Sequence, residues 1–162
     1  MLNIEIMCVG KMSQSWFSDG FEEYRKRLSA FDKVTVTEIA EYRISDDTDS
    51  ARAEAVKREG EVLLKRLRDD SRSVKVALCV EGRQYSSEEL ALLLEKTRQE
   101  TSRIVFVIGG SAGLSEEVKK ECTVRMSMSR MTFPHQMARM ILAEQLYRAE
   151  SINSGMRYHK RT

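Results

Sequence analysis

Short apolar runs alternate with amphipathic stretches along the whole chain, and this alternation predicts the secondary structure. Strands are expected where a run is short, apolar and closed by polar residues or glycine: 4–9, 34–39, 74–80, 104–108 and 124–128. Helices are expected where apolar side chains recur at helical spacing: 13–28, 51–67, the stretch opened by the capping box at Ser86, a short stretch from Ser115, and a final helix with Pro134 at its first position that ends near residue 149.

Strands that alternate with helices predict an α/β fold with a mostly parallel sheet and helices on both faces. The run Ile-Val-Phe-Val-Ile at 104–108 has no polar position, which is typical of a strand buried on both sides. The chain has 162 residues, 41% of them hydrophobic, and shows no repeat, low-complexity segment or linker. A single domain over residues 1–162 is therefore expected.

The three cysteines and the absence of a long apolar run bear on where the protein works. Cys8, Cys79 and Cys122 form no CxxC pair, and their odd number favours reduced thiols. No basic segment followed by an apolar stretch opens the chain, and no run is long enough to span a bilayer. These features predict a soluble, cytoplasmic protein without a membrane partner.

Basic residues are concentrated at the C-terminal end of the chain. Residues 125–162 hold seven Lys/Arg and two Glu, a balance of +5, whereas the rest of the chain has a balance of −3. Such an asymmetry is expected where one end of a protein meets a polyanion. A solvated basic tail without a partner would show the same asymmetry, so charge alone leaves both readings open.

Two loops that follow predicted strands carry the candidate chemistry, because ligands bind at the carboxyl ends of strands in open parallel sheets. The loop Gly-Gly-Ser-Ala-Gly-Leu (109–114) allows a sharp turn and close approach of the backbone to a ligand. It has neither the lysine of a phosphate-binding loop nor the spacing of the dinucleotide fingerprint. A plain glycine-rich turn is the alternative.

The second loop is rich in methionine and precedes the final helix. Polarizable Met side chains suit a pocket for an adenine or a thioether, although a packed core is the commoner explanation. His135 stands just inside a predicted helix start, where the helix dipole favours a neutral, structural imidazole. With two histidines and scattered cysteines in the chain, no metal site is expected. No serine stands in a nucleophile-elbow motif.

The tail forms a third candidate region. Tyr158 and His159 stand among Arg157, Lys160 and Arg161, and an aromatic ring between cations can stack on a base while its neighbours contact phosphates. A disordered basic end is the alternative that the residues themselves do not exclude.

Four ordered motifs together resemble a known family. They are IGGSxGL (108–114), MTFPHQM (131–137), AEQLYRA (143–149) and YHK (158–160). They resemble the bacterial ribosomal RNA large-subunit methyltransferase H family over essentially the whole chain. Cys79 and Arg83 are mild departures, at positions where an acidic residue and a lysine are common.

The resemblance implies a fold and an activity that patterning alone would not suggest. It implies the SPOUT superfamily, whose C-terminal segment threads a loop into a trefoil knot, a feature almost absent among folds. It also implies a homodimer that uses S-adenosylmethionine, without metal, to methylate N3 of a pseudouridine in large-subunit (23S) ribosomal RNA of the assembled ribosome.

The resemblance further implies site residues, all named here by their numbers in this chain. The implied cofactor-binding residues are Leu78, Gly109, Met128, Ser129, Arg130, Met131, Thr132 and Phe133. Beside these, we expect Tyr158, His159 and Arg148 to be the catalytic residues that position the nucleotide, with His159 as one candidate base. Two alternatives remain: a non-catalytic RNA-binding ribosome-assembly factor, and a nucleotide-dependent enzyme of different chemistry.

Overall fold

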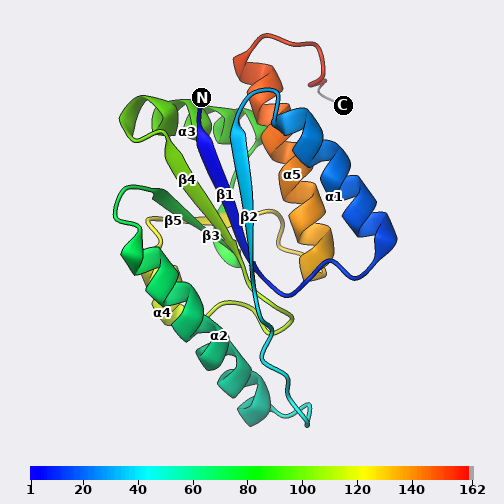
Figure 1. Ribbon diagram of the computed structural model, residues 1–162, viewed down its shortest axis with the longest axis vertical. Helices are drawn as coiled ribbons and strands as arrows, with labels where there is room; N and C mark the ends of the chain where they lie inside the picture. The colour runs from blue at the N-terminus through cyan, green and yellow to red at the C-terminus, as the bar shows by residue number, and fades with distance from the viewer. Residues whose placement is uncertain (161–162) are drawn as a thin grey trace.

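The computed structural model describes residues 1–160 and contains one five-stranded sheet. Its strands are β1 (Asn3–Val9), β2 (Lys33–Ile39), β3 (Val74–Gln84), β4 (Arg103–Ile108) and β5 (Val124–Ser127). They lie in the order β2-β1-β4-β3-β5, and every neighbouring pair is parallel (Figure 1). The expected α/β fold with a parallel sheet is confirmed.

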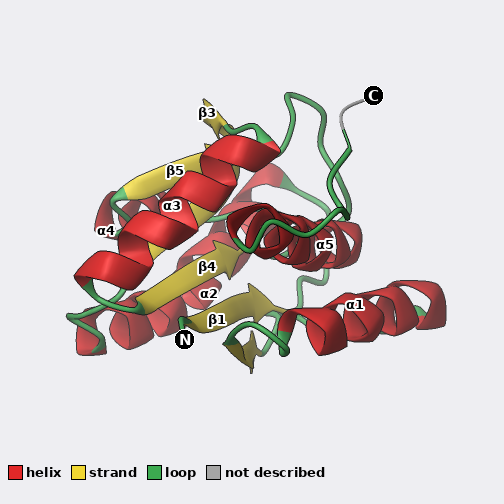
Figure 2. Ribbon diagram, turned by 90° about the horizontal axis from the view of Figure 1, so that it is seen from above, coloured by secondary structure: helices red, strands yellow, loops and turns green. Residues whose placement is uncertain are grey.

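Five helices cover the two faces of this sheet: α1 (Ser15–Leu28), α2 (Asp49–Asp69), α3 (Ser87–Glu100), α4 (Glu116–Glu121) and α5 (His135–Asn153). One buried cluster joins α1, α3 and α5 to the sheet, and a second joins α2 and α4 to its opposite face (Figures 1 and 2). None of the helices within residues 1–160 is long and apolar enough to cross a membrane.

The strand β4 contributes side chains to both buried clusters, as the apolar run at 104–108 predicts. Ile104, Phe106 and Ile108 of β4 point into the cluster of α1, α3 and α5. Val105 and Val107 point into the cluster of α2 and α4. Because successive side chains of a strand alternate between faces, a strand covered on both sides must be apolar throughout.

Several element ends differ from those expected, most clearly in β3 and α5. β3 continues beyond Glu81 and Gly82 to Gln84, because the chain bulges and then pairs with β5 again: both Leu78 and Arg83 lie opposite Met126. Pro134 is the N-cap of α5 rather than its first helical residue, with an extended ψ of 143°, and the helix runs to Asn153. The Ser86 cap is confirmed, since its hydroxyl accepts from the Glu89 N–H at 3.0 Å.

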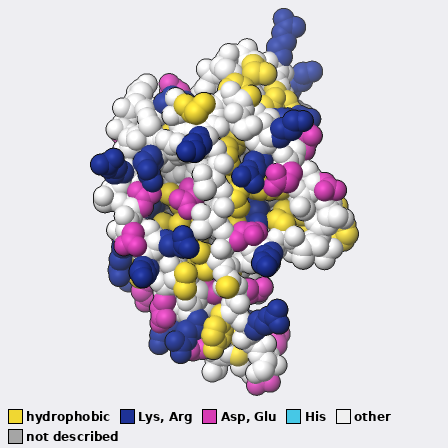
Figure 3. Space-filling view, viewed as in Figure 1, with side chains coloured by type: hydrophobic (Ala, Val, Ile, Leu, Met, Phe, Trp, Pro, Cys, Tyr) yellow, Lys and Arg dark blue, Asp and Glu magenta, His cyan; other side chains and the backbone are white. Residues whose placement is uncertain are grey.

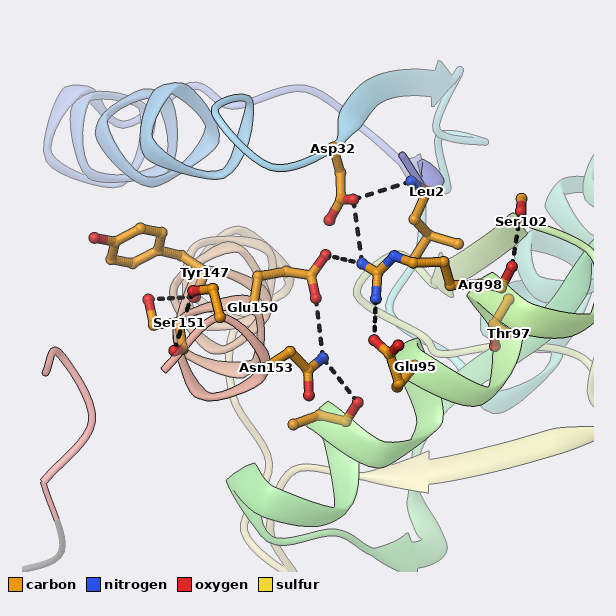
Figure 4. Close-up of polar contacts among 12 residues, drawn as sticks. Leu2, Asp32, Glu95, Thr97, Arg98, Ser102, Tyr147, Glu150, Ser151 and Asn153 are labelled. Atoms are coloured by element: carbon orange, nitrogen blue, oxygen red, sulfur yellow. Dashed lines mark hydrogen bonds and ion pairs between the residues drawn. The ribbon is translucent and has the colours of Figure 1, made fainter. Parts of the chain in front are cut away.

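A buried ionic cluster joins α1, α3 and α5 at the end of the sheet where β1 begins (Figure 4). Arg98 of α3 pairs with Asp32, which follows α1, at 3.4 Å, and with Glu150 of α5. Asp32 also accepts from the Leu2 N–H at 3.1 Å, and Glu150 accepts from Asn153 at 3.1 Å. The side chains of Asp32 and Glu150 are 0% and 2% exposed, so two carboxylates that water hardly reaches share one guanidinium.

Candidate active site

A cavity of about 780 Å³ opens where β3, β4 and β5 end. Its walls come from the bulge of β3, the loop after β4, the loop after β5, and the first turn of α5. The carboxyl ends of parallel strands meet at one edge of a sheet, and this is the edge at which ligands bind in open α/β folds. The cavity therefore lies where the sequence places its two candidate loops.

The first wall is the bulge of β3. Leu78 is the last residue of β3 paired with β5 before the register shifts, and Cys79, Val80 and Glu81 of the bulge also face the cavity. Glu81 forms an ion pair with Lys119 of α4, and this hydrogen bond lowers the pKa of the Glu81 carboxyl. Burial raises the pKa of the Cys79 thiol, so Cys79 contributes a neutral side chain to the wall.

The second wall is the glycine loop after β4, which folds back on itself. Gly110 and Gly113 form an isolated antiparallel bridge, and the Gly113 N–H donates to the Gly110 carbonyl at 3.0 Å. Gly113 has a φ of +86°, which an L side chain rarely adopts. A Cβ on Gly109 would lie 2.7 Å from the carbonyl carbon of Gly113. The sharp turn expected from the sequence is confirmed, and it leaves no room for a side chain at Gly109.

The third wall is the loop after β5, whose shape two serines hold. The Ser127 hydroxyl donates to the Ser129 carbonyl at 2.8 Å, and the Met131 N–H donates to the Ser129 hydroxyl at 3.0 Å. Met128 and Phe133 are half-buried at the cavity, whereas Met131 is 73% exposed at its edge. An apolar wall with the long, exposed side chain of Met131 at its rim suits a ligand with a flat, apolar portion.

Seven of the eight cofactor residues expected from the sequence line this cavity: Leu78, Gly109, Met128, Ser129, Met131, Thr132 and Phe133. Arg130 is exposed and does not line it, because the serine-held turn directs this position outward. The bulge residues and Lys119 were not anticipated. The sequence does not predict either of them. The bulge has no characteristic residue pattern here, and Lys119 reaches the cavity only through the tertiary placement of α4.

His135 was read as a structural residue, yet it lies at the wall of the cavity. Its Nδ1 is buried and has no hydrogen-bond partner among the described residues. The ring packs beside Gly10, where an added Cβ would lie 3.3 Å from the imidazole Cε1. Nearby, Arg139 of α5 donates to the Gly10 carbonyl at 3.0 Å and pairs with Glu38 at 2.7 Å. These contacts fix the start of α5 against the ends of β1 and β2.

The expected catalytic residues lie together, but at the far end of α5. Arg148 Nη1 is 3.3 Å from His159 Nδ1, and Tyr158 donates to Glu144 Oε1 at 3.1 Å. Glu144 also accepts from Arg148, and His159 Nε2 is 3.1 Å from Glu88 Oε1. Burial, followed by hydrogen bonding and by the nearby Glu144 charge, raises the pKa of the Tyr158 phenol. Basic side chains project from this end of the molecule (Figure 3).

This tail cluster does not line the cavity of its own chain. Arg148 lies thirteen residues beyond His135 on α5, which corresponds to about 20 Å along the helix axis. In Figure 1 the tail leaves α5 at the end of the molecule opposite to the loops that follow the strands. Within one subunit, the structure therefore brings together the cofactor residues and, separately, the tail residues.

The described part of the chain contains no preformed metal-binding site. No three His, Cys, Asp or Glu side chains of residues 1–160 are grouped so that they could hold a metal ion. Burial raises the pKa of Cys8 and of Cys122 to about 11, so both are buried neutral thiols rather than metal-ready thiolates.

Two solved structures show that the fold of this chain occurs in other proteins. A probable methylase family protein from Haemophilus influenzae matches with a TM-score of 0.55 at 16% identity, over 98% of this chain and 70% of its own. A putative methyltransferase from Legionella pneumophila, solved with bound SAM, matches with a TM-score of 0.54 at 11% identity, over 90% and 65%. A family model described as "Predicted SPOUT methyltransferase" matches residues 2–159, which sets the class.

Relatives of similar length narrow this class. Proteins named "Ribosomal RNA large subunit methyltransferase H" are 45% identical in Bifidobacterium animalis subsp. lactis and 43% identical in Lactiplantibacillus plantarum. Each alignment covers 98% of this chain and 100% of the relative. The chain belongs to the ribosomal RNA large subunit methyltransferase H family of SPOUT methyltransferases.

Proposed function

We propose that this protein transfers the methyl group of S-adenosylmethionine to ribosomal RNA. The observation that carries the proposal is the cavity at the carboxyl edge of the sheet, walled by the glycine loop and the methionine-rich loop. We further propose that the methyl acceptor is N3 of a pseudouridine in large-subunit RNA on the assembled ribosome; this is the finer form of the proposal. The names of the family relatives support an RNA substrate, and the motifs shared with that family support the finer form.

The residues of the cavity fit this cofactor. A volume of about 780 Å³ lies within the range of about 300–1,000 Å³ usual for small-molecule sites. Leu78, Met128 and Phe133 offer apolar surface for an adenine ring and a thioether. The backbone of the glycine loop and of the β3 bulge can offer N–H and C=O groups at close range, because no side chain intervenes at Gly109.

The chemistry asks for positioning more than for a reactive side chain. When bound, S-adenosylmethionine supplies a methyl group already activated on a sulfonium sulfur. The cavity walls fix its orientation and exclude water, and alignment of two reactants can supply roughly 7–11 kcal/mol of the barrier. The N3–H proton must also leave, and a general base would add about 10²–10⁴-fold. His159 is our candidate for this base.

We propose that Arg148, Tyr158 and His159 position the nucleotide at the cavity of a partner subunit. In one chain these residues lie about 20 Å along α5 from the cavity, too far to contact the same bound nucleotide. A two-fold homodimer that packs α5 against its copy can bring each tail toward the other subunit's cavity. The tail deletion described below tests this arrangement.

The acceptor can be tested by primer extension on ribosomal RNA from cells with and without this protein. N3 lies on the pairing edge of the base, so its methylation interrupts reverse transcription. We expect one additional stop in large-subunit RNA when the protein is present. Purified protein should recreate the stop on assembled ribosomes from the deletion strain, and transfer to protein-free RNA should be at least about tenfold slower. Residues 125–162 carry a balance of only +5, and within them Arg139 is buried and Arg148 is paired with Glu144. Such a segment binds RNA weakly and without sequence preference, so ribosome surface must add contacts.

Deletion of residues 156–162 tests the role of the tail in the same experiment. It should remove transfer while S-adenosylhomocysteine binding and the dimer persist, because residues 156–160 lie outside both the cavity and α5. Identical stops in the two strains, or equal rates on protein-free RNA, would overturn the finer proposal. Ribosome binding without any transfer would instead favour a non-catalytic assembly factor.

A further inference from the structure

A second, smaller pocket of about 300 Å³ lies on the other side of the glycine loop. Ser111 and Ala112 line both this pocket and the cofactor cavity. The other walls are the segment 41–44, which leaves β2, and Ala55 and Glu59 of α2. In Figure 1 this segment (cyan) runs down from β2 toward the start of α2, passing the loop that follows β4. None of the residues placed at the cofactor or in the tail accounts for this pocket.

Glu59 is the unusual residue of the pocket, because it is a carboxylate that is only 5% exposed. One oxygen, Oε2, accepts from the Tyr42 N–H at 3.0 Å. The other, Oε1, lies 3.3 Å from the position that a Cβ on Gly110 would occupy and has no hydrogen-bond partner in residues 1–160. Burial raises the pKa of the Glu59 carboxyl, which reflects this incomplete compensation. A carboxylate held in a pocket with one acceptor unused is suited to a ligand that donates an N–H or O–H.

The rim of this second pocket also carries an aromatic ring, that of Tyr42, and a cationic side chain, that of Arg43. Tyr42 is 42% exposed, and its backbone rather than its ring is held by Glu59. Arg43 is exposed, and the described residues give it no ion pair. An exposed aromatic face, a free guanidinium and a buried acceptor within one small pocket are the groups that recognise an unpaired nucleotide: stacking, a phosphate contact and a base-edge hydrogen bond.

We propose that this pocket binds one base of the RNA substrate through an N–H of the base edge, which donates to Glu59, while Tyr42 stacks on the base and Arg43 contacts the backbone phosphate. The proposal rests on the proposed function, since it assigns a second nucleotide contact beside the cofactor cavity. Guanine and the uracil-type bases carry a ring N–H, whereas adenine and cytosine do not. Adenine and cytosine could donate an exocyclic amino N–H instead, so this contact requires a donor on the base edge and does not by itself select the base.

Other occupants fit the pocket less well. A divalent cation would find only the two carboxylates of Glu41 and Glu59 there, and the described residues contain no group of three potential ligands. A free anion would be repelled by Glu59, and an apolar ligand would leave its Oε1 without a donor. The position next to the loop shared with the cofactor cavity favours part of the substrate.

The test is Glu59→Gln, which is nearly isosteric. The glutamine carbonyl can keep the Tyr42 N–H contact, but an NH₂ group then replaces the free acceptor beside Gly110. We expect S-adenosylhomocysteine affinity within twofold of wild type and a loss of at least about tenfold in kcat/KM on ribosomes, mainly through KM. Glu61→Gln, an exposed position on the same helix, is the matched control and should behave as wild type. Wild-type kcat/KM for Glu59→Gln overturns the proposal.

A second pair of variants tests the ring independently of the buried carboxylate. Tyr42→Ala should lower ribosome affinity about tenfold in sedimentation, because it removes the stacking face, whereas Tyr42→Phe should bind within twofold of wild type. Suppose first that wild type transfers methyl groups. If Tyr42→Ala and Glu59→Gln then have the ribosome affinity and the kcat/KM of wild type, the pocket proposal fails and the proposed function stands. If wild type binds ribosomes without transfer and both variants bind less tightly, the pocket stands and the proposed function fails. Wild type that neither binds nor transfers overturns both.

Discussion

Gly109 is the residue on which the shape of the large cavity depends most directly. Any Cβ there would lie 2.7 Å from the Gly113 carbonyl carbon, closer than real Cβ contacts come. We expect Gly109→Val to weaken S-adenosylhomocysteine binding at least about 100-fold in calorimetry with EDTA present, because the glycine loop must move into or away from the cavity. The far-UV circular dichroism should change little, since this loop lies outside the helices and strands.

Gly155→Ala is the control for this substitution. An added Cβ at Gly155 would meet no atom within 4 Å, and the strain of a side chain at its φ of +74° acts beyond the end of α5, far from the cavity. Binding should therefore remain within twofold of wild type. Gly109→Val that binds as tightly as wild type would contradict the assignment of the glycine loop to the cofactor. Wild type that shows no heat and no thermal shift at millimolar ligand would contradict cofactor binding itself.

At the scale of elements, the ionic cluster of Asp32, Arg98 and Glu150 ties α1, α3 and α5 together and should make stability depend on pH. Burial, with Asp32 as a neighbour, raises the pKa of Glu150 to about 7 from 4.5. The folded chain therefore holds a proton that the unfolded chain releases between about pH 4.5 and 7. The free energy of unfolding should fall by about 1–3 kcal/mol as pH rises through this window.

Urea denaturation at pH 5 and pH 8, at fixed protein concentration, measures this effect. Glu150→Gln cannot titrate, so its stability relative to wild type should rise between the two pH values. Glu95→Gln is the control, because Glu95 pairs with the same Arg98 but is 44% exposed, and its pH dependence should follow wild type. Parallel pH profiles for wild type and Glu150→Gln would rule out this role for Glu150.

The elements themselves were largely predictable, because their signals are local. The apolar run at 104–108 and the Ser86 cap each depend on neighbouring residues, and both are confirmed. The continuation of β3 past Gly82 was not predictable: a Cβ there would lie 2.8 Å from the Arg125 backbone, so this glycine permits close pairing rather than ending the strand. A knot depends on how the whole chain threads, so it remains an implication of the family.

The candidate site was predictable only in part for the same reason. The strand-end rule brings the loops of Gly109 and Phe133 to one edge, and the structure places both at the cavity. Glu59 gave no signal, because it is one of many charged residues on a helix and only the packing of α2 under the glycine loop buries it. The position of the tail relative to a partner's cavity depends on a second subunit, so it stays a prediction.

At the scale of the whole molecule, we expect a homodimer through α5. Leu142 and Leu146 of α5 are buried in the subunit's own core. Met137 and Ile141 are half-buried and belong to neither core cluster among the described residues, so they are the apolar positions left for a partner. Light scattering at micromolar concentration should give twice the 18.6 kDa mass of the chain.

Ile141→Glu should shift this mass toward that of a single chain, because it places a charge in the proposed interface. Val62→Glu is the control: Val62 is 46% exposed on α2, across the sheet from α5, and the variant should stay dimeric. A wild-type mass of 18.6 kDa would overturn the dimer, and with it the proposal that each tail serves a partner's cavity.

The strand order also sets when this protein can fold during its own synthesis. β1 is made first but lies inside the sheet, between β2 and β4, with Asn3 paired to Arg103. At about 5–20 residues per second, translation takes about 5–20 s to cover that separation. During this interval β1 can pair with β2 only, and its other edge remains open to water and to other chains. β4 can cover this edge only after residue 108 has left the ribosome, and the last strand, β5, ends at Ser127, so folding is a late event in the life of the nascent chain.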